Sequence, residues 1–273
     1  LGKNSSEYKS SPQIELMSLY EFNSSLPLIK KDNTSKSIIT PKISFRFNPA
    51  EMKNYSSTSR NINADNIFSL NRFALDDTLE SGRSLTLGID YRKEKLGDIN
   101  KYFETKIATV IRDKEENFIP KKSTLNKKTS NLYGSIKNNF SKNLSFDYKF
   151  AIDNDLNTFE YSDLGAKLTL NNFSTELNFI QENGEMGDDD IMENSFFYNL
   201  NEKNKLSFNT RRNRKLNLTE YYDLVYEYKN DCLIAGLKYK KSYYEDRDLK
   251  PEENLFFTIT LFPLTNFEQK ISQ

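Results

Sequence analysis

The chain contains no histidine and no tryptophan, one cysteine (Cys232) and only nine glycines among its 273 residues. The absence of histidine excludes Ser-His-Asp catalysis and histidine metal sites. A single cysteine cannot form a disulfide within the chain or a cysteine zinc cluster. The glycines form neither a phosphate-binding loop nor a dinucleotide-binding motif. These absences predict a protein that is not an enzyme and binds no cofactor.

The chain also has no excess of positive or negative charge, because 39 Lys and Arg residues balance 39 Asp and Glu residues. The chain therefore has no general attraction for nucleic acid. No apolar run reaches the roughly 18 residues that a transmembrane helix needs. Hydrophobic residues make up only 36% and mean hydropathy is -0.74, yet 20 Phe and 16 Tyr are present. A polar chain rich in aromatic residues suggests apolar side chains confined to one face of many strands.

Alternation of apolar and polar residues recurs along the chain. In the stretch 144–152, Leu144, Phe146 and Tyr148 alternate with Ser145, Asp147 and Lys149. This period of two is typical of β-strands, and no convincing helix is expected. We predict about thirteen strands, near 12–22, 38–48, 82–92, 102–112, 129–139, 143–152, 158–169, 172–180, 190–200, 203–211, 218–228, 231–243 and 254–262.

The connections between these strands sort by length. Suppose that the strands cross an outer membrane and that 254–262 ends in the periplasm. The long connections 49–81 and 113–128 then both lie outside the cell, and tight turns such as 229–230 and 170–171 lie in the periplasm. Outer-membrane barrels have short periplasmic turns and longer external loops. The external set is 244–253, 212–217, 181–189, 153–157, 113–128 and 49–81, and the periplasmic set is 229–230, 201–202, 170–171, 140–142, 93–101 and 23–37.

We therefore expect an all-β fold in which the chain is part of a large antiparallel transmembrane β-barrel. Most predicted strands have the 9–11 residues that a tilted strand needs to cross a bilayer, whereas strands of soluble proteins usually have about 5–6. An odd strand count cannot close such a barrel, so further strands are expected upstream of Leu1. The strands would span about 12–262, followed by a C-terminal tail, 263–273. A soluble β-sandwich binding module is the alternative, because it alternates in the same way.

Two stretches resemble the LptD family of lipopolysaccharide-assembly proteins. The first runs from Asn66 to Phe73 within the long 49–81 connection, and its family-like residues are Asn66, Phe68, Leu70, Asn71, Arg72 and Phe73. After it the chain departs from the family's Gly-Tyr-Asp-Arg-like turn and reads Ala74-Leu75-Asp76-Asp77. The second stretch begins at Tyr222, passes through Asp231-Cys232-Leu233 and ends at Leu261.

The resemblance implies the C-terminal half of an outer-membrane barrel of a Gram-negative bacterium, which inserts lipopolysaccharide into the outer leaflet. It implies an LptE-like plug lipoprotein, periplasmic bridge proteins for lipopolysaccharide and the outer-membrane barrel-assembly machinery as partners, and no nucleic acid. Lipid would leave through a lateral opening beside the last barrel strand, 254–262, whose apolar residues are Leu255, Phe257, Ile259 and Leu261. A generic porin or passive channel is the alternative function for this fold.

The resemblance also implies that Cys232 forms a disulfide with a cysteine outside this chain; the other interpretation is a small buried residue. A basic cluster, Arg211, Arg212, Arg214 and Lys215, is either a solvated rim or a contact for lipopolysaccharide phosphates. The run 187–190 is an acidic loop or a weak cation site, and 246–248 is an ion-paired loop rather than a catalytic carboxylate pair. Alternation directs these charged residues to the lumen: Lys42, Arg46, Asp90, Arg92, Asp147, Lys149, Lys167, Asp223, Glu227, Lys238 and Lys240.

Overall fold

A computed structural model describes residues 17–243, 251–261 and 265–271. Its regular structure is β-strand apart from two short 3-10 turns, η1 (Lys121–Ser123) and η2 (Gly184–Met186). No helix in the described ranges is long and apolar enough to cross a membrane. The strands are β1 (Tyr20–Ser25), β2 (Leu28–Lys31), β3 (Ser35–Asn48), β4 (Gly82–Lys95), β5 (Asp98–Arg112), β6 (Leu132–Ser141), β7 (Leu144–Ile152), β8 (Phe159–Leu170), β9 (Phe173–Glu182), β10 (Asp190–Asn199), β11 (Asn204–Asn213), β12 (Leu218–Lys229), β13 (Leu233–Ser242), β14 (Glu252–Leu261) and β15 (Thr265–Ile271).

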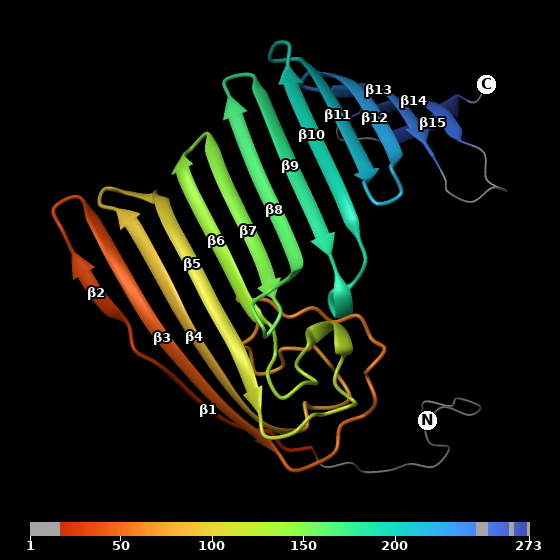
Figure 1. The fold of residues 1–273 in the computed structure, drawn as a ribbon. Coiled ribbons are helices and arrows are strands. Elements are labelled where there is room, and N and C mark those ends of the chain that lie inside the picture. Colours follow the sequence, from red (N-terminus) through yellow and green to blue (C-terminus); the bar gives the residue numbers. More distant parts are fainter. Residues whose placement is uncertain (1–16, 244–250, 262–264, 272–273) are drawn as a thin grey trace, which may run out of the picture.

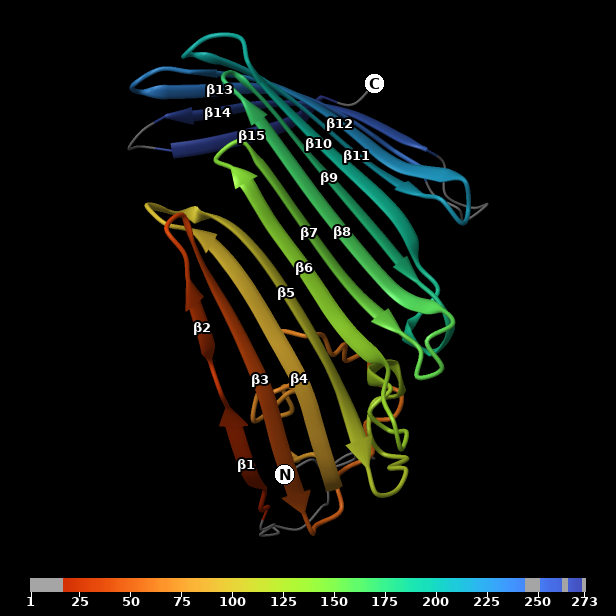
Figure 2. The ribbon, with the colours of Figure 1, turned by 60° about the vertical axis from the view of Figure 1, so that its left-hand side comes forward.

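All of these strands form one antiparallel sheet, in which each strand from β3 to β15 pairs with the next along the chain. Strands β1 and β2 lie end to end against β3 and so share one position. Figures 1 and 2 show the sheet twisting and curling from β3 to β15, and among the described residues its two edges have no strand partner. A sandwich requires two packed sheets. The sandwich alternative is therefore wrong, and the predicted all-β antiparallel fold is confirmed.

The two ends of the sheet differ in the length of their connections, as the sequence predicts. At one end lie the 49–81 and 113–131 loops and the connections 153–158, 183–189 and 214–217. At the other end lie the turns 32–34, 96–97, 142–143, 171–172, 200–203 and 230–232. Figure 1 shows the long loops gathered below the sheet and the short turns above it. We call these the long-loop end and the short-turn end.

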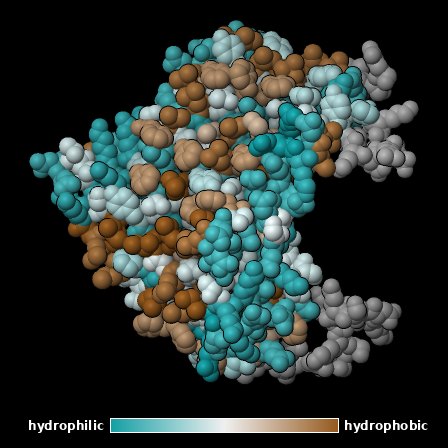
Figure 3. Space-filling view, in the orientation of Figure 1, coloured by the Kyte–Doolittle hydropathy of each residue, from teal (hydrophilic) through white to brown (hydrophobic). Residues whose placement is uncertain are grey.

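The register of the strands separates a polar face from an apolar one. Ser44 pairs with Thr86, Asp90 with Lys106, and Asp223 with Lys240, so these polar positions share one face from β3 to β13. All eleven charged residues expected in the lumen lie on it, and we call it the inner face. The opposite, outer face exposes many large apolar side chains, among them Ile43, Phe45, Leu87, Ile89, Ile107, Leu224, Leu237 and Phe257. In Figure 3 apolar side chains gather across the middle of the visible face, and hydrophilic ones cover the loops below.

The buried core lies on the inner face at the long-loop end. Ala108, Val110, Tyr133 and Ala151 occupy inner-face positions of β5, β6 and β7. The 49–81 and 113–131 loops cover them with the following buried apolar residues: Met52, Ile62, Ile67, Phe73, Leu75, Ile119 and Leu125. The long loops therefore fold over the sheet instead of extending away from it.

Two connections are shorter in the structure than the sequence predicts. The connection expected at 23–37 is mostly strand, and its only true reversal is the turn 32–34. A second, smaller interruption lies at Leu26-Pro27, where the Leu26 N–H donates to the Pro41 carbonyl at 3.1 Å. Both prolines lack an N–H, so the ladder breaks here without ending the strand. The connection expected at 93–101 shrinks to Leu96-Gly97, because Gly97 adopts φ +84° and allows a tight turn.

The C-terminal part of the prediction also needs correction. The segment expected as a tail, 263–273, contains β15, which pairs with β14 from Leu255↔Ile271 to Leu261↔Thr265. Strand β14 therefore has a neighbour on each side, because it also pairs with β13. The assignment of Leu255, Phe257, Ile259 and Leu261 to the last strand is wrong. The edge strand in the described residues is β15, which satisfies the hydrogen-bonding groups that β14 would otherwise expose.

Candidate functional site

The most strongly buried charged cluster joins the 49–81 loop to the inner face. Glu80 of this loop accepts from Arg72 Nε at 2.7 Å and from Arg112 Nη1 at 2.6 Å. Arg46 of β3 approaches the same carboxylate at 3.6 Å. The three arginine side chains are at most 2% exposed, and Glu80 is 6% exposed. One carboxylate thus lies among three buried guanidinium groups.

Hydrogen bonds to neighbouring strands complete this cluster. Arg72 donates to Thr86 Oγ1 at 3.2 Å and to Ser84 Oγ at 3.3 Å, both on β4. Arg46 donates to the Glu21 carboxylate of β1 at 2.9 Å and to the Leu70 carbonyl at 3.3 Å. Buried charges are stable only when they are paired and hydrogen-bonded. The cluster therefore ties the loop to three neighbouring strands and to β5.

Burial alone would raise the pKa of Glu80, but the charges of Arg72, Arg112 and Arg46 outweigh it and lower the pKa from 4.5 to about 2. A second attachment is Asp65, which pairs with Lys106 at 2.6 Å and with Lys137 at 3.2 Å. Burial opposes ionisation of Asp65 too, and these two lysines hold its pKa below the usual value. The ionised carboxylates of Glu80 and Asp65 therefore hold the 49–81 loop against the inner face through ion pairs.

We expect the attachment of the 49–81 loop to survive mild acid. Because the folded pKa of Glu80 is depressed, its contribution is fully present above pH 4.5 and is lost as the pH falls through about 2. Pepsin should therefore cut the loop slowly at about pH 3.5 and rapidly below about pH 2. The measurement is the rate of appearance of loop-cleaved fragments. Equal rates at the two pH values would contradict the assignment.

The family-like segment lies at the centre of this loop. Arg72 and Phe73 are buried. Asn71 closes a turn, since its side chain donates to the Leu75 carbonyl at 2.7 Å and accepts from the Leu75 N–H at 3.1 Å. Phe68 lies over the inner face so closely that a Cβ on Gly88 would meet its ring at 2.8 Å. The segment therefore shapes and anchors the loop.

Two members of the segment have other surroundings. Asn66 accepts from the Asn63 N–H at 2.9 Å and so stabilises a local turn. The Leu70 side chain is 60% exposed, although its carbonyl accepts from Arg46. Glu80, Arg112 and Glu21 complete the site and were not singled out from the sequence. No short motif marks them, because they lie on separate elements that only the sheet register brings together.

The four residues of the predicted basic cluster do not share a common partner. Each of its members has its own partner: Glu193 and Glu220 for Arg211, Asp190 for Arg214, Asp188 for Lys215, and the Asn217 side-chain oxygen for Arg212. Arg214 also lies 5.1 Å from the centre of the Phe179 ring. The local charge is largely neutralised, which favours a solvated rim. Contact with lipopolysaccharide phosphates stays a prediction.

The remaining candidates divide between exposed turns and segments outside the described residues. Asp188 and Asp190 pair with basic residues, and no group of three or more potential metal-ligating residues occurs in the described ranges. Cys232 is exposed in the turn 230–232, with its N–H donating to Asn230 Oδ1 at 3.0 Å. The run 246–248 lies outside the described residues.

Comparison with known proteins gives a family match. The family model described as LPS transport system D, LptD, matches residues 2–190, well over half of the chain. No curated protein matches. Among solved structures, a mutant of Rhodopseudomonas blastica porin has a TM-score of 0.37 and 8% identity, covering 91% of this chain and 90% of the porin. A triple mutant of that porin also has a TM-score of 0.37 and 8% identity, covering 93% of each chain.

The porin likeness is too weak to say anything about function. The family match rests on sequence, and it includes the 66–73 segment and the loop that carries Glu80. The sheet that this loop covers is open, antiparallel and apolar on its outer face. The chain belongs to the LptD family, LPS transport system D.

Proposed function

We propose that this chain forms part of the wall of an outer-membrane barrel that inserts lipopolysaccharide into the outer leaflet. The observation that carries the proposal is the division of one sheet into an exposed apolar outer face and a charged inner face. Strands β3 to β14 have 9 to 15 residues, enough to cross a bilayer. An inner polar surface suits the sugar and phosphate part of an amphiphile, and the apolar surface suits its acyl chains.

Charged side chains on the inner face occur as cross-strand pairs that remain partly exposed. Lys42 pairs with Asp90 at 2.6 Å, and the Lys42 side chain is 30% exposed. Lys149 pairs with Asp163 at 3.4 Å and Lys238 with Asp223 at 3.3 Å. Partly exposed pairs exchange partners at low cost. Such a surface could therefore contact a charged headgroup that passes along it.

In this proposal the long-loop end lies outside the cell and the short-turn end lies in the periplasm. The lateral opening is then expected beside the edge strand β15, and not beside the 254–262 segment. The LptE-like plug and the periplasmic bridge would approach the inner face from the short-turn end, away from the buried loop cluster. Copurification of an LptE-like lipoprotein with the full-length protein would support this arrangement.

Site-specific photo-crosslinking in cells tests the function. Ser145 and Leu144 are neighbours at the short-turn end of β7, but Ser145 belongs to the inner face and Leu144 to the outer face. A photo-reactive residue in full-length protein should form a lipopolysaccharide adduct at position 145, visible by immunoblotting. The matched variant at position 144 should form none, because it faces the periplasmic leaflet. Absence of adducts at position 145, together with passive ion conductance, would favour a generic channel.

The disulfide implied by the family at Cys232 is a separate expectation. Cys232 is exposed at the short-turn end, where a periplasmic cysteine could reach it, and the periplasm is oxidising. Substitution Cys232→Ser in the full-length protein should change mobility on non-reducing gels and leave it unchanged after reduction. Identical mobility of the two proteins without reductant would show that Cys232 is unpaired.

A further inference from the structure

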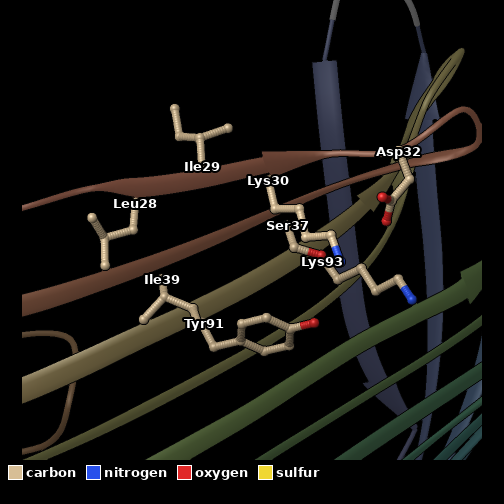
Figure 4. Close-up of a pocket in the computed structure, with 8 residues that line it drawn as sticks. All are labelled: Leu28, Ile29, Lys30, Asp32, Ser37, Ile39, Tyr91 and Lys93. Carbon is tan, nitrogen blue, oxygen red and sulfur yellow. The ribbon is translucent and has the colours of Figure 1, made fainter.

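A pocket of about 440 Å³ lies on the outer face at the short-turn end of β2, β3 and β4. Its floor includes Leu28, Ile39 and Tyr91, and its rim includes Lys30, Lys93 and Asp32. Figure 4 shows the two lysine side chains reaching toward the same end of the hairpin, beside Ser37. The volume is in the range of small-ligand pockets.

The sheet register arranges this pocket in two rows. Lys30 pairs with Ser37, which pairs with Lys93, so one polar row crosses three strands. Leu28 pairs with Ile39, which pairs with Tyr91, so an apolar row lies two residues farther from the turn. Two residues of strand span about 7 Å. The pocket therefore passes from charged to apolar over the distance between a lipid headgroup and the start of its acyl chains.

The two rim lysines differ from their inner-face neighbours on the same strands. On the inner face, Lys36 pairs with Glu94 at 3.6 Å and Lys42 with Asp90 at 2.6 Å. Lys30 and Lys93 are exposed, and neither forms an ion pair within the part of the chain that the structure describes. Their ammonium groups are available to an anion from outside the protein.

We propose that this pocket binds the headgroup of a glycerophospholipid that carries ethanolamine. The phosphate lies between Lys30 and Lys93, the first carbons of the acyl chains contact Ile39 and Tyr91, and the amine faces Asp32. Two cations and one carboxylate match one phosphodiester and one ammonium group. The short-turn end places the pocket in the periplasmic leaflet, which separates this lipid from lipopolysaccharide in the outer leaflet.

The inference rests on the membrane placement in the proposed function, and it does not need lipopolysaccharide transport. Native mass spectrometry of purified full-length protein, titrated with phosphatidylethanolamine, measures occupancy directly. The double variant Lys30→Ala/Lys93→Ala should lower the affinity roughly five- to tenfold. The matched control, Lys142→Ala/Lys203→Ala, removes two exposed lysines from other short turns and should change it less than about twofold.

The lipid series separates the possible sources of phosphate. Asp32→Asn should weaken phosphatidylethanolamine and leave phosphatidylglycerol unchanged, because only the former carries an amine. Equal losses in the pocket variant and the control variant would overturn the proposal, as would lipopolysaccharide binding as tightly as phosphatidylethanolamine. Heat-modifiable migration checks folding, and Lys30→Gln/Lys93→Gln replaces the alanine pair if it misfolds. If lipid binding depends on the two lysines but position 145 forms no lipopolysaccharide adduct, the transport proposal is contradicted and the lipid-binding proposal stands.

Discussion

Substitution Glu80→Gln should detach the 49–81 loop and destabilise the folded protein by about 3–5 kcal/mol, the cost of removing one partner from a buried ion pair. Glutamine keeps the shape of the side chain but leaves Arg46, Arg72 and Arg112 buried without their shared anion. The measurement is the midpoint of urea unfolding in detergent, with loop cleavage by protease as a second readout. Unchanged midpoint and cleavage would show that the cluster does not hold the loop.

Two further variants make this test specific. Asp77→Asn removes an exposed ion pair with Lys53 in the same loop. Asparagine keeps a side-chain oxygen that can accept from the Tyr55 hydroxyl, so the change should cost less than about 1 kcal/mol. The double variant Glu80→Gln/Arg72→Gln should recover part of the lost stability, because it removes a buried charge along with its partner. Additive losses in the double variant would contradict the proposed coupling between Glu80 and Arg72.

Substitution Leu224→Arg should prevent or strongly weaken assembly, since it places a charge in the middle of β12 on the apolar outer face. Leu224 is 41% exposed there. An arginine on the lipid-facing side near the bilayer midplane costs about 2–4 kcal/mol. The measurement is the fraction of heat-modifiable protein in outer-membrane extracts, followed by unfolding in urea.

The neighbouring residue provides the control. Val225 is also aliphatic, but it pairs with Ser207 and Lys238 on the inner face. Val225→Arg should therefore assemble close to the normal level, because an arginine there meets a polar surface. Similar behaviour of the two variants would mean that the outer face does not contact lipid. This pair separates the effect of the face from the effect of the added charge.

Most of the fold could be predicted from alternation and connection length. The pattern at 144–152 identifies a strand, and the parity of the loops groups the described connections at the same two ends of the sheet as the structure does. The predicted connection 244–253 lies mostly outside the described residues. The errors occurred where polar or proline-containing sequence conceals pairing. Charged ends of β4 and β5 remain in the sheet because Arg92 pairs with Glu104 at 3.0 Å. The sequence does not predict β15, because Thr265–Ile271 is short and mostly polar.

The candidate site was less accessible from the sequence. Arg72 was identified through the family-like segment and Arg46 through alternation, but neither pattern indicates that they share a partner. Glu80, Arg112 and Glu21 come from a loop and two strands up to 91 positions apart (112 − 21). A pattern along the chain reports which face a residue occupies. It does not report which side chains from distant elements meet on that face.

The sequence by itself determined a β-structure with one apolar and one charged face, the alternation of long and short connections, and the family. Those features depend on period and spacing, which are local properties of the chain. Only the tertiary structure decided that the long loop folds inward onto β3–β5, that one carboxylate joins three arginines, and that two exposed lysines lie at the rim of a pocket on the outer face. These depend on register and chain reversal, which bring distant residues together.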